Sequence, residues 1–184
     1  MNKTYQTELR RIFLIRDLPE PLTRSSSHLQ IFDNYIENTR LRIRSMRSPE
    51  TKEWHFVLQQ RFSLGEDFAR WKIAEIYLNE AEHALFEQFE GRKIHENERA
   101  ETNEIRKNRY FYDLDNRQIE IDLFLGGLWG LNLVRTVFED EKDFENFEIP
   151  PFVIAEVTDN PFFFGENLVG KHFKDIQAEF ARNR

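Results

Sequence analysis

The sequence contains no cysteine, and this absence excludes disulfide bonds, thiolate metal sites and cysteine nucleophiles. The beginning of the chain has neither a long apolar run nor a small-residue cleavage site, so we expect a cytoplasmic protein. The longest apolar-rich stretch, residues 123–134, contains three glycines and is too short to cross a bilayer. We therefore expect no membrane partner.

An excess of positive charge is also missing. The chain has 26 Lys and Arg residues against 33 Asp and Glu residues, which gives a net charge of −7. Because nucleic acids and membrane surfaces are negatively charged, this balance argues against general nucleic-acid binding. An anion would have to bind in a local pocket that gathers basic side chains. The glycine-containing run at residues 126–130 matches neither the Rossmann nor the P-loop fingerprint.

Phenylalanine is abundant, with 18 copies in 184 residues, and it indicates a large aromatic core rather than disorder. A chain of this length is sufficient for one domain with a substantial core. We expect the run Phe162-Phe163-Phe164 to join that core or to close a barrel, rather than to stack on a nucleobase.

The most informative stretch is residues 40–44, where basic and apolar side chains alternate with a period of two. In a strand, Arg40, Arg42 and Arg44 would share one face. Guanidinium groups match phosphate oxygens, so such a row inside a barrel would hold phosphate groups. The alternative is a solvated strand face, on which Arg42 and Arg44 pair with Glu120 and Asp122.

The pattern of apolar segments and turn residues along the chain is typical of β-strands joined in hairpins. Strands are predicted at residues 7–15, 31–36, 40–46, 54–62, 68–76, 105–112, 117–125 and 128–138. Short helices are predicted at residues 79–89, 139–147 and 168–180, and the first carries a capping box made by Asn79 and Glu82. We expect a mainly β (α+β) fold, one domain over residues 1–184, built as an eight-stranded antiparallel tunnel-like barrel with decorating helices.

Several motifs follow one another in an order that resembles the CYTH family, also called triphosphate tunnel metalloenzymes. They are Glu8-Leu9-Arg10, Leu41-Arg42-Ile43-Arg44, Lys107-Asn108-Arg109-Tyr110, Glu120-Ile121-Asp122, Pro150-Pro151 and Glu156-Val157-Thr158. The resemblance covers nearly the whole chain. It implies an eight-stranded tunnel whose basic residues grip a triphosphate and whose glutamates hold one or two divalent metal ions. Activities in the family include hydrolysis of inorganic or organic triphosphates and cyclisation of ATP.

The resemblance also assigns roles to individual residues. It implies phosphate ligands at Arg42, Arg44, Lys107 and Arg109. It places Glu120 and Asp122 on the tunnel floor, as catalytic candidates that help to position a metal ion or a water molecule. Two more basic residues, Arg10 and Arg135, stand where the family has glutamates. We expect them to neutralise carboxylates inside the barrel or to contact the ligand directly.

These two arginines change the expected metal chemistry. At about 4 Å and an effective dielectric constant near 20, each pair of unit charges interacts by about 4 kcal/mol, and a dication doubles that repulsion. We therefore do not expect a metal ion in the usual place of the family. Mg²⁺ or Mn²⁺ would need a displaced site built from the remaining candidates, Glu8, Glu120, Asp122 and Glu156.

Three functions follow as hypotheses. The first is a divergent family member that binds a small polyphosphorylated anion, a triphosphate or a nucleotide, with metal-dependent phosphohydrolase activity weakened or lost. The second is an active metal-dependent triphosphatase with a relocated metal site, and the third is a non-catalytic interaction scaffold. The retained basic residues favour the first over the third, and the lost glutamates favour the first over the second. An exposed C-terminal helix could also support a homodimer.

Overall fold

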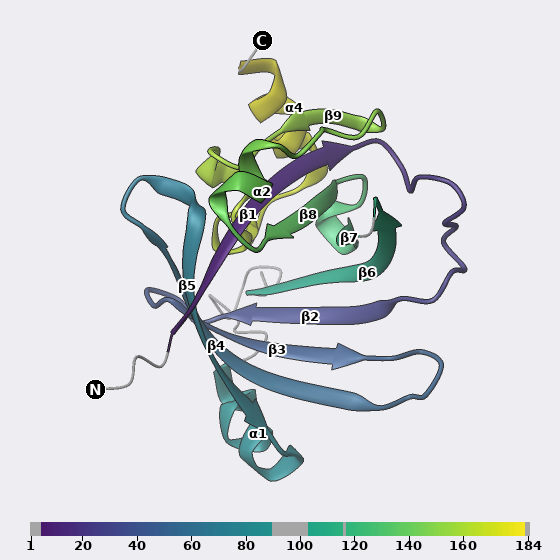
Figure 1. Cartoon of the computed structure of the whole chain (residues 1–184). Helices are drawn as coiled ribbons and strands as arrows, with labels where there is room; N and C mark the ends of the chain where they lie inside the picture. Colours follow the sequence, from purple (N-terminus) through teal and green to yellow (C-terminus); the bar gives the residue numbers. More distant parts are fainter. Residues whose placement is uncertain (1–4, 90–102, 116, 183–184) are drawn as a thin grey trace.

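The computed structural model describes residues 5–89, 103–115 and 117–182, and its centre is an antiparallel β-barrel (Figure 1). Neighbouring strands follow the order β5-β4-β3-β2-β6-β7-β8-β1, and a further pairing between β5 and β1 closes the barrel. The barrel strands are β1 (Gln6–Ile15), β2 (Leu29–Tyr35), β3 (Leu41–Arg47), β4 (Trp54–Leu64), β5 (Asp67–Leu78), β6 (Glu104–Leu114), β7 (Arg117–Phe124) and β8 (Asn132–Phe138).

Strand β1 closes the barrel because it is long enough to have three neighbours. Its first residues pair with β5, and residues 9–14 pair with β8. Its last residues, 13–15, pair with a short additional strand, β9 (Val153–Glu156), which lies outside the barrel order. In Figure 1, β1 accordingly runs across the molecule from β5 towards β9.

Short helices lie at opposite ends of the molecule (Figure 1). At one end, α1 (Glu80–Phe86) begins with the predicted capping box. In it, the side chain of Asn79 accepts a hydrogen bond from the backbone N–H of Glu82, and the side chain of Glu82 accepts one from the backbone N–H of Asn79. At the other end lie α2 (Glu141–Glu145), α3 (Gly165–Leu168) and α4 (Phe173–Arg182). None of the helices in the described ranges combines the length and apolar character required to cross a bilayer.

Apolar side chains cover the outside of one half of the barrel, and this arrangement leaves the inside free for charge. On β7, Ile119, Ile121 and Leu123 are buried beneath loop residues that include Leu18 and Phe147. The residues that alternate with these three along β7 therefore point into the barrel. A second apolar cluster docks α4 against the barrel through Ile176. The aromatic-rich composition thus builds an outer core, as well as the ends of the barrel.

The expected mainly β barrel with decorating helices is confirmed, with three local differences. Strand β9 was not predicted. The predicted strand at residues 128–138 begins only at Asn132, because η2 (Gly126–Leu128) and a turn precede it, with Gly126 in the left-handed region at φ 64°. Arg40 precedes β3 and is exposed, with its guanidinium over the Phe62 ring, so it does not continue the row of Arg42 and Arg44.

An end cap, defined here as residues 161–168, covers one end of the barrel interior; it comprises η3 (Pro161–Phe163), Phe164 and α3. Its backbone approaches β2 so closely at Gly165 that an added Cβ would lie 1.8 Å from the Tyr35 hydroxyl oxygen. No side chain fits at that distance, so the end cap or Tyr35 would have to move.

We predict that Gly165→Ala lowers the free energy of unfolding by about 1–3 kcal/mol, because the methyl group overpacks against Tyr35. Urea denaturation measures this loss. The matched control is Gly127→Ala, whose Cβ would meet the exposed His172 side chain at 3.1 Å and the Lys171 carbonyl oxygen at 3.3 Å, and which should cost less because both distances are far longer than 1.8 Å. Equal losses in the two variants would contradict the assignment of a tight contact at Gly165.

Candidate functional site

The barrel interior is lined by basic side chains. Among the described residues, seven basic groups surround a cavity of about 90 Å³, namely Arg10, Arg42, Arg44, Arg61, Lys107, Arg109 and Arg135. They come from five strands, and alternation along each strand points them to the same side. Six of the seven are the basic residues singled out in the sequence. Arg42 and Arg44 are buried, so the alternative of a solvated strand face is wrong for them.

Asp33 on β2 holds the two arginines of β3. It is 1% exposed and accepts bonds from Arg44 Nε at 2.6 Å and Nη2 at 2.8 Å. Arg42 Nη1 donates to the same carboxylate at 3.3 Å. Burial raises the pKa of Asp33, but Arg42 and Arg44 lower the pKa more, and the balance leaves it well below its usual range. This carboxylate is therefore a permanent anion.

Asp122 on β7 holds the two basic residues of β6 in the same way. Lys107 Nζ donates to it at 2.7 Å, and Arg109 donates through Nε at 2.7 Å and Nη2 at 2.8 Å. Burial lowers the pKa of Lys107 to about 8, although the charge of Asp122 acts in the opposite direction. Lys107 is thus a buried ammonium group whose charge depends on its anionic neighbours.

Arg135 on β8 lies between two carboxylates. Its Nη1 donates to Glu8 on β1 at 2.7 Å, and its Nε donates to Glu120 on β7 at 2.7 Å. Burial raises the pKa of both carboxyl groups, but the nearby guanidinium groups lower it further, to about 2 in each case. The guanidinium of Arg135 therefore occupies the point at which these two carboxylates converge.

Arg10 and Arg61 are the basic groups with the fewest partners. Both reach Glu8 only at long range, 3.4 Å for Arg10 and 3.7 Å for Arg61. Arg10 Nε, Arg61 Nε and Arg61 Nη2 are buried without a hydrogen-bond acceptor in the described structure. The two guanidinium groups also approach the ring of Trp71, at 4.2 Å and 5.5 Å from its centroid.

Arg10 and Arg61 have N–H groups without acceptors because the barrel interior contains more cations than carboxylates. Seven cations face five carboxylates, which leaves a surplus of two; the carboxylates are Glu8, Asp33, Glu120, Asp122 and Glu166. Burial lowers the pKa of Arg10 to about 10, against the opposing charge of Glu8. Burial, and then the charges of Arg42 and Arg10, lower the pKa of Arg61 well below its usual range. An anion in the cavity would relieve both effects.

The end cap closes the cavity with aromatic side chains. Phe164 packs edge-on against Trp71 at 5.1 Å and against Phe68 at 5.2 Å, and Phe163 lines the cavity beside it. Beneath the cap, the Tyr35 hydroxyl accepts a bond from Arg42 Nη1 at 3.1 Å. The phenylalanine run thus takes part in closing the barrel, as the sequence predicts.

Two groups of residues differ from the sequence-based expectation. Glu156 lies apart from the interior carboxylates, on the exterior strand β9, where Arg11 Nε donates to it at 2.9 Å. Asp33 and Arg61 were missed as site residues. Alternation could have indicated Arg61, which follows Gln59 by two positions. For Asp33 it gives only a strand face shared with Ile31 and Tyr35, and not the contact with Arg44.

The interior does not fit the divalent metal ion that the fold family implies. Glu8 and Glu120 are already bridged by Arg135, and Asp122 is engaged by Lys107 and Arg109. No group of three or more Asp, Glu or His side chains is arranged to hold a metal ion within the described ranges. A dication would have to displace a guanidinium that it repels.

The paired carboxylates predict an acid-sensitive fold. Because the pKa of Glu120 is about 2 in the folded protein and near 4.5 when unpaired, its contribution is complete above pH 4.5 and disappears as the pH falls towards 2. We expect Glu120→Gln to lose about 3 kcal/mol of unfolding free energy at pH 7 and to approach the parent protein near pH 2. Denaturant titrations between pH 2 and 7 measure this, with Glu50→Gln, in an exposed turn, as the control. Parallel curves for parent and Glu120→Gln would contradict the pairing.

Comparison with solved structures identifies the fold. A structure described as the hypothetical protein NE1496 matches with a TM-score of 0.55 and 20% identity, and covers 90% of this chain and 99% of that chain. Another, described as the inorganic triphosphatase NE1496, has a TM-score of 0.55 and 22% identity, and covers 88% and 93%. No protein-family model and no curated protein matches the chain. The expected resemblance is confirmed in architecture: the chain has the tunnel fold of the CYTH, or triphosphate tunnel, proteins.

Proposed function

We propose that this protein binds a small inorganic polyphosphate in the barrel interior without a divalent metal ion. The observation that carries the proposal is the pair Arg10 and Arg61, whose buried N–H groups have no acceptor in the described structure. Buried donors without acceptors are unfavourable, and a buried surplus of positive charge is more so. Phosphate oxygens would supply both the acceptors and the missing negative charge.

Polyphosphate suits this arrangement because its charges are spaced along a chain. Arg10, Arg42 and Arg61 line the cavity from β1, β3 and β4, and Lys107 and Arg109 line it from β6. A phosphate group held by Arg10 and Arg61 would leave further phosphoryl oxygens to reach the other basic groups, which already have carboxylate partners. The similar structure of NE1496, which is described as an inorganic triphosphatase, supports this class of ligand.

The size of the cavity favours an inorganic chain over a nucleotide. Pockets that bury drug-sized ligands usually measure about 300–1,000 Å³. The interior cavity measures about 90 Å³ and is bounded by the end cap at Phe163 and Phe164. A triphosphate chain is itself larger than this cavity, so the surrounding side chains must move apart to admit it, and a base and a ribose would require a still larger movement. We therefore expect nucleoside triphosphates to bind more weakly than inorganic triphosphate.

Catalysis is expected to be weak or lost because four of the five described carboxylates around the cavity, Glu8, Asp33, Glu120 and Asp122, are already engaged by basic groups. Attack by water on a phosphoryl group needs a group that positions or deprotonates that water, and metal ions usually neutralise the developing charge. Glu8 and Glu120 each have a pKa lowered to about 2, so they are poor proton acceptors at neutral pH. Arg135 can supply charge to a bound polyphosphate, but it cannot supply a nucleophile.

Binding without metal ions is tested by the shift in melting temperature with sodium tripolyphosphate in EDTA. We expect a clear rise that added Mg²⁺ does not increase, because the guanidinium groups already provide the cations. A rise that requires Mg²⁺ or Mn²⁺, together with phosphate release that Glu120→Gln abolishes, would instead establish a triphosphatase with a relocated metal site. No rise under any condition would exclude a tunnel ligand and leave the scaffold function.

The role of Arg61 is tested by Arg61→Gln, for which we expect opposite effects on binding and stability. Loss of a charge-assisted bond to phosphate should weaken tripolyphosphate binding at least tenfold, or about 1.4 kcal/mol. The unliganded protein should become more stable, because a buried cation with unbonded donors is removed. Calorimetry and urea denaturation measure the two quantities, with Arg40→Gln outside the barrel as the control. Unchanged affinity in Arg61→Gln would contradict the proposed site.

A further inference from the structure

The end cap differs in kind from the other walls of the interior cavity. The strands of the barrel are hydrogen-bonded to neighbours on both sides. The end cap, residues 161–168, makes all of its hydrogen bonds in the described structure within residues 160–171. Side-chain packing and charge, rather than hydrogen bonds, therefore hold this part of the chain against the barrel. The end cap can move as a unit without breaking the hydrogen bonds of either.

The chain is fixed on both sides of the end cap. On one side, the Val157 N–H donates to the Ile12 carbonyl of β1 at 2.8 Å. On the other side, α4 is docked through Ile176, which is 2% exposed. Gly170 lies between the end cap and α4 in the left-handed region, at φ 72°, where glycine is favoured. Residues 159–172 thus form a strap that is anchored at its two ends and carries the end cap in its middle.

The proposed ligand can extend in one direction only, which is towards the end cap. Glu8 on β1 and Glu120 on β7 lie beyond one end of the cavity, and neither of them lines it. Further along the same two strands, Ile12 and Phe124 line the cavity together with the end cap. A phosphate chain that grew towards the glutamates would meet two negative charges. Because the cavity is smaller than the chain, the chain must press against the end cap instead.

The end cap also brings a carboxylate to the cavity. Glu166 lines the cavity but is exposed, and no basic residue is paired with it within the described ranges. Burial lowers the pKa of Arg10, whereas the negative charges of Glu8 and, more weakly, Glu166 raise it. Glu166 therefore lies near enough to attract the guanidinium that the proposed anion would use. Since like charges repel, Glu166 and a phosphate chain compete for Arg10.

We propose that the end cap is a lid that a polyphosphate chain displaces, and that Glu166 favours the closed lid by competing with the chain for Arg10. Without ligand, Glu166 supplies part of the missing negative charge, and Phe164 covers Trp71. With ligand, phosphoryl oxygens take the place of Glu166, and the lid stays displaced because the closed cavity does not hold the chain. This lid presupposes the proposed polyphosphate site, on which it acts.

Trp71 reports the position of the lid. It is 3% exposed, and the Phe164 ring packs edge-on against it at 5.1 Å. The other two tryptophans, Trp54 and Trp129, are 45% and 56% exposed. In Trp54→Phe/Trp129→Phe, acrylamide quenching of fluorescence therefore measures access to Trp71 alone. We expect saturating tripolyphosphate in EDTA to raise the Stern–Volmer constant at least about twofold, and sodium chloride of equal ionic strength to leave it unchanged.

Two variants that weaken the closed state should bind tripolyphosphate more tightly. Phe164→Ala removes the ring that packs on Trp71, and Glu166→Gln removes the competing charge. Because a closed lid reduces the fraction of protein that can accept the chain, we expect each variant to lower the dissociation constant about threefold in calorimetry. Glu166→Gln changes an exposed side chain, so it tests the lid even if Phe164→Ala does not fold.

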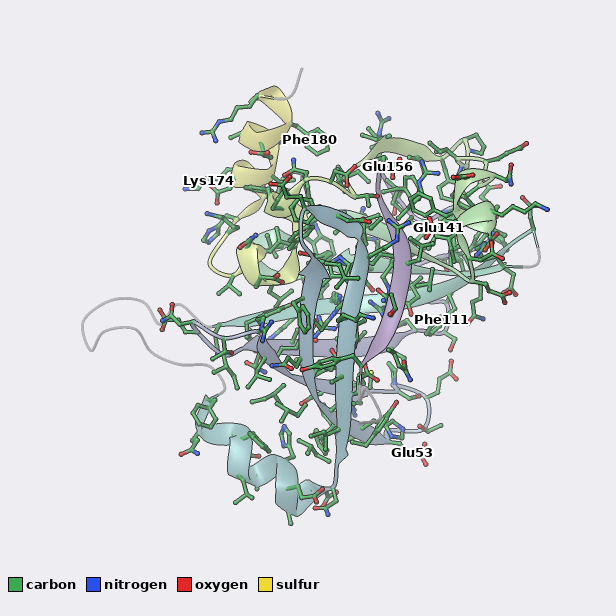
Figure 2. All side chains as sticks on the ribbon, turned by 60° about the vertical axis from the view of Figure 1, so that its left-hand side comes forward. Glu53, Phe111, Glu141, Glu156, Lys174 and Phe180 are labelled. Atoms are coloured by element: carbon green, nitrogen blue, oxygen red, sulfur yellow. The ribbon has the colours of Figure 1, made fainter. Side chains whose placement is uncertain are left out.

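Each variant has a matched control. Phe152→Ala removes a half-buried ring that packs edge-on against Tyr112, in the apolar cluster outside the barrel. Glu53→Gln removes one exposed carboxylate, and Figure 2 shows Glu53 at the opposite end of the molecule from Phe180 on α4. Both controls should bind tripolyphosphate as the parent protein does.

Two results would overturn the lid and leave the proposed function intact. The first is unchanged quenching of Trp71 while calorimetry shows that tripolyphosphate is bound. The second is an unchanged or weaker affinity in Glu166→Gln. If the parent protein does not bind tripolyphosphate at all, the proposed function itself is wrong, and the lid is overturned with it.

Discussion

The structure depends on one electrostatic constraint: cations enclosed in a closed barrel must find anions inside the same barrel. Asp33 and Asp122 each hold two basic residues, and Arg135 joins Glu8 to Glu120. These ion pairs fix the positions of guanidinium groups that would otherwise repel one another. These ion pairs do not neutralise all of the positive charge inside the barrel, because Arg10 and Arg61 keep buried N–H groups without an acceptor in the described structure. The interior therefore keeps a buried surplus of positive charge, and this surplus is the basis of the proposed anion site.

The protein can remain stable with a charged interior because its apolar core lies on the outer face of the barrel strands. Ile119, Ile121 and Leu123 on β7 face outwards and are buried under loops, while Glu120 and Asp122 between them face inwards. A barrel with a solvated exterior would have to fill its centre with apolar side chains to be stable, and would have no space for charge. The loops at residues 17–28 and 147–153 thus contribute to the site without touching it, since they provide the burial that the interior does not.

Local pattern predicted the strands and the direction of their side chains, and long-range register decided the rest. The alternation around Arg42 and Arg44 correctly indicated an inward face, and the order of motifs indicated the barrel. Their partner Asp33 depends on how β2 aligns with β3, where Asp33 lies opposite Arg44, and no local signal fixes that alignment. Strand β9 escaped prediction because it has four residues and its partner, β1, lies about 140 positions away in sequence. Arg61 was accessible from alternation, but its lack of acceptors emerges only when five strands meet.

The contact between Gly165 and Tyr35 also has an evolutionary consequence. The Tyr35 hydroxyl accepts a hydrogen bond from Arg42, and the end cap packs directly against that hydroxyl at Gly165. The position of the end cap therefore depends on the position of a residue that contacts the site. A side chain at residue 165 becomes less costly once position 35 carries a smaller residue, but that change would release Arg42 from one of its partners. Lineages that share this tyrosine should therefore share the glycine, and the two positions should be exchanged together or not at all.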